Sequence, residues 1–143
     1  MPETVLDTKE DDALLCVDRM RPGLQKIINQ RFKNDALICA MTTTFAELLR
    51  ERGGSEEPLI RAAATFSKLP PATRDQMRAC HSQIKILITA VKREGFSLDA
   101  ILWSMLGAIT SIYQGFRFPK DQIEAACEDM IRRINEARQL SIN

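Results

Sequence analysis

Apolar residues recur along this chain at the spacing of an α-helix almost throughout. No stretch alternates apolar and polar residues between turn signals, as a half-buried strand does. The clearest apolar seam, in residues 74–94, consists of Met77, Cys80, Ile84, Leu87 and Val91. Its alternating steps of three and four residues place the whole seam on one helix face. The pattern therefore predicts an all-α protein with little or no sheet.

Capping and turn residues divide this pattern into six or seven helices. Pro22 predicts a break, because the residue before a proline is biased away from the helical conformation. Thr73 with Gln76 matches a capping box for the helix that follows. Gly95 fits the end of that helix, and Ser97 fits the cap of the next one. We expect helices at about residues 9–20, 22–33, 35–52, 57–69, 74–94, 98–114 and 119–140.

The helix at residues 98–114 is the only predicted helix without a charged face. Its apolar stretch contains Asp99 and several hydroxyl side chains, whereas a membrane-spanning helix has few or no charges. We therefore expect a single-domain bundle, residues 9–143, packed around this helix. Residues 1–8 precede the domain and are expected to form a frayed acidic arm.

Charge and cysteine content indicate which partners and which compartment the protein has. The 143 residues include 20 basic and 19 acidic side chains, for a formal net charge of +1. This balance provides no whole-protein attraction to nucleic acid or to an anionic membrane. The four cysteines are scattered and form no CxxC pair. Because no secretory signal is recognisable, we expect free thiols and a cytoplasmic location.

The chain offers little material for catalysis or for metal binding. His81 is the single histidine, so any relay through an imidazole must use it. Its neighbour Cys80 points about 100° away around the helix, which is a poor geometry for a shared metal ion or for a nucleophile and base. No glycine-rich phosphate loop occurs. We therefore expect no enzyme activity, no cofactor and no metal.

A basic stripe is the first surface that this sequence predicts. It consists of Arg74, Arg78, His81, Lys85 and Lys92. At helical spacing these side chains fall within an arc of roughly 60°, beside the apolar seam. Such a stripe suits an acidic helix, an acidic tail or a phosphate backbone, and the chain's own residues 7–12 are one conceivable ligand. A solvated helix face with no ligand is the alternative.

A stripe of small residues is the second predicted surface. It consists of Ala100, Ser104, Gly107 and Ser111, in steps of four, three and four. Small side chains let another backbone approach closely, and Trp103 flanks them with a large surface of the kind found at binding centres. The stripe fits a groove or a self-association face. An ordinary helix contact within the chain is the alternative.

The function that these features favour is a cytoplasmic helical interaction module that is not an enzyme. An adaptor, a regulator or a chaperone-like partner would fit, and so would self-association into a small oligomer. The expected partner is another protein with an acidic or helical segment. The first alternative is non-specific nucleic-acid binding through the basic stripe. The second is a carrier that holds a small apolar ligand between the helices at residues 35–52 and 98–114.

Overall fold

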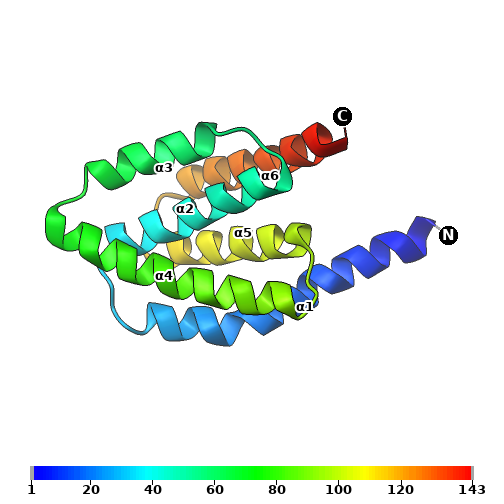
Figure 1. Ribbon diagram of the computed structural model, residues 1–143, viewed down its shortest axis with the longest axis horizontal. Helices are drawn as coiled ribbons and strands as arrows, with labels where there is room; N and C mark the ends of the chain where they lie inside the picture. The colour runs from blue at the N-terminus through cyan, green and yellow to red at the C-terminus, as the bar shows by residue number, and fades with distance from the viewer. Residues whose placement is uncertain (1, 143) are drawn as a thin grey trace.

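The protein is a bundle of helices (Figure 1). A computed structural model describes residues 12–140 in full, and residues 2–11 and 141–142 only as parts of the terminal helices. Within these limits the chain forms six helices and no strand, which confirms the predicted all-α single domain. The helices are α1 (Pro2–Ile28), α2 (Asn34–Arg52), α3 (Glu57–Ser67), α4 (Pro71–Arg93), α5 (Leu98–Gly115) and α6 (Lys120–Ile142). The predicted acidic arm at residues 1–8 lies outside the fully described residues and stays a prediction.

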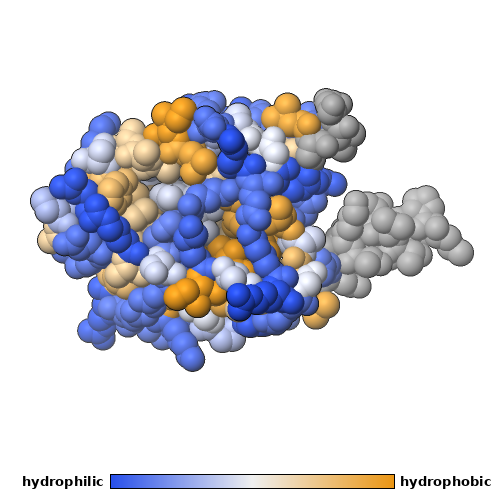
Figure 2. All heavy atoms as spheres, in the orientation of Figure 1, coloured by the Kyte–Doolittle hydropathy of each residue, from blue (hydrophilic) through white to orange (hydrophobic). Residues whose placement is uncertain are grey.

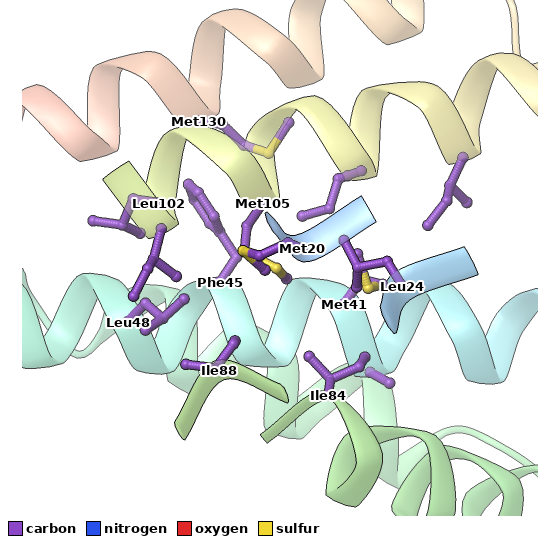
Figure 3. Close-up of a cluster of buried hydrophobic side chains, with 14 of the residues drawn as sticks. Met20, Leu24, Met41, Phe45, Leu48, Ile84, Ile88, Leu102, Met105 and Met130 are labelled. Atoms are coloured by element: carbon purple, nitrogen blue, oxygen red, sulfur yellow. The ribbon is translucent and has the colours of Figure 1, made fainter. Parts of the chain in front are cut away.

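Helices α2 and α5 form the centre of the bundle. Helix α2 packs against α3, α4, α5 and α6, and α5 packs against α1, α2 and α6. Figure 3 shows Met41 and Phe45 of α2 together with Leu102 and Met105 of α5 and Met20 of α1, all of them buried. Each large apolar side chain buried in this way stabilises the fold by roughly 1.5–3 kcal/mol. The predicted central position of α5 is confirmed, and α2 shares it.

Helix α1 continues through Pro22, where the sequence analysis predicts a break. Proline removes one helical hydrogen bond and crowds the preceding turn. Packing offsets this loss, because Met20 and Leu24 stay buried on the same face on either side of the proline. In addition, Gly23 lets α4 come close, since a Cβ at this position would lie 2.7 Å from Leu87 Cδ1. The predicted pair of helices at residues 9–20 and 22–33 was therefore wrong.

Several predicted helix ends are found in the structure. The Ser97 side chain caps α5 by accepting a hydrogen bond of 3.1 Å from the Ala100 N–H. Gly53 ends α2 with φ 111°, and Gly95 follows α4 with φ 98°. Both glycines adopt the left-handed conformation that glycine reaches without a steric penalty. These local signals were sufficient to locate two connections, between α2 and α3 and between α4 and α5.

The predicted start of α4 was wrong by one turn. The helix begins at Pro71, and Thr73 is buried inside it. Proline at the first helical position needs no partner for an N–H, so no capping box is required there. Gln76 instead accepts a hydrogen bond of 2.8 Å from the Lys33 backbone N–H. The side chain expected to cap α4 therefore supports the start of α2.

The apolar helix α5 is a core helix. Asp99 near its start pairs with Arg52 of α2, with 2.8 Å between Oδ1 and Nε. Most of its large apolar side chains are buried against neighbouring helices. In the described part of the chain, no helix combines the length and the apolar character needed to cross a membrane.

Candidate interaction site

The basic stripe lies along α4 at its contact with α2. His81 Nε2 is 2.6 Å from Glu47 Oε1, and Lys85 Nζ is 3.7 Å from Glu47 Oε2. Further along α4, Lys92 Nζ is 2.7 Å from Glu51 Oε2. Glu47 and Glu51 lie one turn apart on α2, so this helix supplies acidic partners for three of the five stripe residues.

The other two stripe residues also contact their own chain or are partly covered. Arg78 Nη1 lies 3.1 Å from Asp75 Oδ1, and its guanidinium lies 5.1 Å from the centre of the Phe66 ring. Arg74 is partly buried. Figure 2 shows the face that carries α3 and α4: hydrophilic residues dominate it, and the hydrophobic ones lie in separate patches. This face has the character of a solvated surface.

Two glutamates of α2, Glu47 and Glu51, contact three of the stripe residues from within the chain. Sequence reasoning missed Glu47 and Glu51 as partners of the stripe. A signal was available, because the two glutamates are four residues apart on the predicted helix at residues 35–52. Residues at this spacing share a helix face. What the sequence did not reveal is that this face lies against α4.

The stripe of small residues on α5 is half buried and half exposed. Ala100 and Ser104 are 3% and 4% exposed, and Ser104 lies beside Cys16 of α1. Gly107 and Ser111 are exposed, and Trp103 is partly buried against the core. The first half of the stripe therefore serves a contact within the chain, as the alternative interpretation predicts. The second half is open.

This open half forms one wall of a groove between α1 and α5. The two helices run parallel, because Ser97 before α5 donates a hydrogen bond of 3.3 Å to Asp12 of α1, while Ile28 and Phe116 line the opposite end of the groove. The groove has a volume of about 540 Å³, and Leu37 of α2 contributes to its lining. Its walls include Val17, Leu24 and Ile28 of α1 and Ser104, Gly107, Ser111 and Gly115 of α5.

Glycine keeps the groove open at two points along α5. A Cβ built on Gly107 or on Gly115 would meet no atom within 4 Å, apart from its own helical surroundings. At Gly23, by contrast, a Cβ would collide with Leu87 of α4. Gly23 is thus needed for close packing within the chain, whereas Gly107 faces free space. A Cβ at position 107 would therefore enter that space without a steric clash.

The groove contains few charged residues, and basic residues lie at one of its ends. Arg21 is the charged residue of the lining, and its Nη1 lies 3.3 Å from Asp18 Oδ1 at an exposed position. Arg31 and Arg117 follow closely on the lining residues Ile28 and Phe116, and both are exposed. Cations are favourable beside the C-terminal ends of helices, where α1 and α5 both end.

The backbone at this end of the groove is strained. Arg31 and Arg117 have φ of 61° and 60°, in the left-handed region that costs roughly 1–2 kcal/mol for a residue with a side chain. At Arg117 the turn is held by Phe118. Its N–H donates a hydrogen bond of 3.1 Å to the backbone carbonyl oxygen of Tyr113, and its ring stacks on the Tyr113 ring with centroids 5.0 Å apart. This pattern of bond and contact is that of a Schellman helix end, with arginine in place of the usual glycine.

A smaller cleft of about 230 Å³ lies on the other side of the core, between α3 and α6. Arg133 lines it, is 9% exposed, and pairs with Asp129 at 3.0 Å and with Glu57 of α3 at 3.7 Å. Burial acts to raise the pKa of Asp129, but hydrogen bonds from Arg133 and Arg132 outweigh it, and the net pKa is lowered. The charges of this cleft are balanced among themselves, and they tie α3 to α6.

The reactive side chains are engaged or protected. His81 contacts Glu47, and burial raises the pKa of the Cys80 thiol to about 12. A thiol with such a pKa is almost wholly protonated near neutrality and is a poor nucleophile. Among the described residues, no three His, Cys, Asp or Glu side chains are close enough together to hold a metal ion. That the chain is not an enzyme and carries no cofactor stays a prediction.

Comparisons with protein-family models, with curated proteins and with solved structures found no match to this chain. The case for a function therefore rests on the geometry of the chain itself. The groove between α1 and α5 is larger than the cleft between α3 and α6, and it contains the exposed half of a stripe that the sequence had marked as a surface.

Proposed function

We propose that this protein is a helical interaction module without catalytic activity, which holds an amphipathic helix of a partner in the groove between α1 and α5. The observation that carries the proposal is the open, nearly uncharged groove of about 540 Å³ with small residues along one wall. An apolar helix face laid into such a groove is a recurring mode of peptide recognition. An adaptor, a regulator or a chaperone-like protein would use it.

The length of the groove supports a helix as the occupant. From Ser104 to Gly115 the wall follows eleven helical steps, a distance of about 16 Å or three helical turns. Gly107 and Gly115 leave room for a second backbone to approach closely, as small residues do between packed helices. The apolar wall on α1 then receives the larger side chains of the incoming helix.

The charges beside the groove support an acidic flank on that helix. Arg21 lies in the lining, and Arg31 and Arg117 stand at one end. A helix with apolar residues on one face and Asp or Glu beside them would be complementary to both features. Charge complementarity of this kind contributes mainly to the association rate and to specificity.

The main alternative functions have less support. Nucleic-acid binding would use the basic stripe on α4, where His81, Lys85 and Lys92 have acidic partners on α2. A carrier of a small apolar ligand has one observation in its favour, because about 540 Å³ falls within the usual range of ligand pockets, about 300–1,000 Å³. That groove lies between α1 and α5, so a carrier would use a different pair of helices from the predicted one.

The proposal includes a cytoplasmic location. Four free thiols support it, of which Cys16, Cys39 and Cys80 are buried and Cys127 is partly buried. Free thiols of this kind are typical of reducing compartments.

The proposal is tested by binding of a fluorescent amphipathic peptide of about 18 residues, long enough to span the groove as a helix. The peptide has leucines at helical spacing and glutamates beside them, and anisotropy reports its binding. We expect saturable binding to the wild-type protein. Binding should weaken at least tenfold in Gly107→Phe, which fills the open space. The matched control is Ala125→Phe, because Ala125 is an exposed small residue of α6 away from the groove.

Three further outcomes would contradict the proposal. Equal binding to wild type and to Gly107→Phe would place the peptide elsewhere. Equal binding of a peptide with the same composition in scrambled order would show that the helical face is irrelevant. A copurifying lipid or metabolite, seen by native mass spectrometry and lost in Gly107→Phe, would favour the carrier instead.

A further inference from the structure

Charge is distributed unevenly along α1. Residues 1–18 contain six acidic side chains and one lysine, for a net charge of −5. Residues 19–33, which complete the helix and its following turn, contain five basic side chains and no acidic one, for a net charge of +5. The two halves of this segment are therefore complementary to each other. A continuous helix cannot bring its own two halves together.

The basic half is only partly neutralised by the rest of the chain. Arg19 pairs with Glu94 at 2.5 Å, and Arg21 pairs with Asp18 at 3.3 Å. Lys26, Arg31 and Lys33 are exposed, and none of them forms an ion pair with a residue that the structure describes. Three cations thus remain available near the end of α1, and Arg31 among them follows closely on the groove residue Ile28.

Apolar surface extends along the same helix beyond the groove. Leu14 is 64% exposed. It precedes the groove residues Val17 and Arg21 by three and seven positions, so all three lie on one side of α1. The rim of the groove therefore continues for a further turn toward the acidic half of the helix. Nothing in the described chain covers Leu14.

We infer that the groove is a self-association surface, and that a second copy of this chain docks there with its α1 antiparallel to the first. The inference rests on the proposed function, since it names one helix that the groove receives. In an antiparallel pair, the acidic half of each α1 faces the basic half of the other, and a two-fold axis repeats the contact. A parallel pair would bring like charges together. The same contact covers Leu14 and the apolar wall of the groove.

The test uses sedimentation velocity of the full chain and of two charge-reversed variants. In the first variant, Glu3, Asp7 and Asp11 become lysine; in the second, Lys26, Arg31 and Lys33 become glutamate. We expect the wild type to sediment as a dimer of the 16.2 kDa chain and to dissociate more readily as salt screens the charges. Each variant alone should dimerise at least tenfold more weakly. An equimolar mixture of the two should recover a heterodimer, because one α1 is now basic and the other acidic.

Controls separate this inference from the proposed function. Circular dichroism must show that both variants keep their helix content, and recovery of the mixture shows in addition that each variant is competent. Suppose that the wild type stays monomeric but still binds the amphipathic peptide, and that this binding is lost in Gly107→Phe. That result would overturn the inference and leave the proposed function standing. A dimer that persists in Gly107→Phe and in both charge variants would also overturn it. Displacement of the second copy by the amphipathic peptide would support both.

Discussion

Helices α4 and α5 each carry a stripe of residues beside their buried face, and the two stripes differ in what they contact. The basic stripe of α4 meets Glu47 and Glu51 of α2, so long charged side chains bridge the space between the helices. The small stripe of α5 has no side chains long enough to bridge a gap. At Gly107, which lines the groove between α5 and α1, the space stays open. Thus the stripe that looks more like a binding site by charge is largely engaged within the chain, and the uncharged stripe is available.

The largest expected difference between the two regions is in their contribution to stability. Ile84 of α4 is fully buried against the core, so Ile84→Ala should lower the free energy of unfolding by about 2–5 kcal/mol. Ile28 lines the groove and is only partly buried, so Ile28→Ala should cost about 1 kcal/mol. Urea denaturation of both variants measures the difference. Equal losses would contradict an open groove, because they would mean that Ile28 is packed as tightly as Ile84.

A smaller effect is expected at the charged contact of α4 with α2. Glu47→Ala removes the partner of His81 and of Lys85, at a position that is about one-third exposed. We expect a loss of about 0.5–1 kcal/mol in the free energy of unfolding, reduced by added salt. Glu124→Ala is the control, since its partner Lys120 is almost fully exposed and 3.8 Å away. A loss no greater than that of the control would show that the stripe on α4 is not held by α2.

A further small effect distinguishes Gly107 of α5 from Gly23 of α1. Gly107→Ala should raise the free energy of unfolding by about 0.5–1 kcal/mol, because alanine is the better helix former and its Cβ meets open space. Gly23→Ala should bring no such gain, because its Cβ would force Leu87 to move. Thermal unfolding of the two variants distinguishes them. If Gly107→Ala proves destabilising, the space above Gly107 is not empty.

Local signals in the sequence predicted most of the fold. Ser97 marks a helix start through a hydrogen bond to its side chain, and Gly95 marks a helix end through its left-handed backbone. Only a few residue types serve in either position, so both can be recognised without knowing the neighbours. Pro22 was misinterpreted because its local penalty is visible in the sequence, whereas the packing that outweighs it is not. The close contact of Gly23 with Leu87 joins residues 64 positions apart, and no local pattern reveals it.

The candidate site was predicted only in part, for a similar reason. The small stripe from Ala100 to Ser111 was recognised from spacing alone. Its division into a buried and an open half depends on the position of α1, which continues as one helix through Pro22. The basic stripe was also recognised, but its partners Glu47 and Glu51 lie on another helix. Spacing identifies a face of a helix, and tertiary packing decides what that face meets.

The most direct test of the account compares the two faces in one experiment. Amide chemical shifts of the ¹⁵N-labelled protein are followed by NMR while the amphipathic peptide is added in excess. If the peptide binds in the groove, shift changes will occur along residues 17–28 and 104–116, which line it, and residues 78–92 of α4 will change little. Changes concentrated on residues 78–92, or no changes on α5, would contradict the claim that the groove between α1 and α5 is the docking surface.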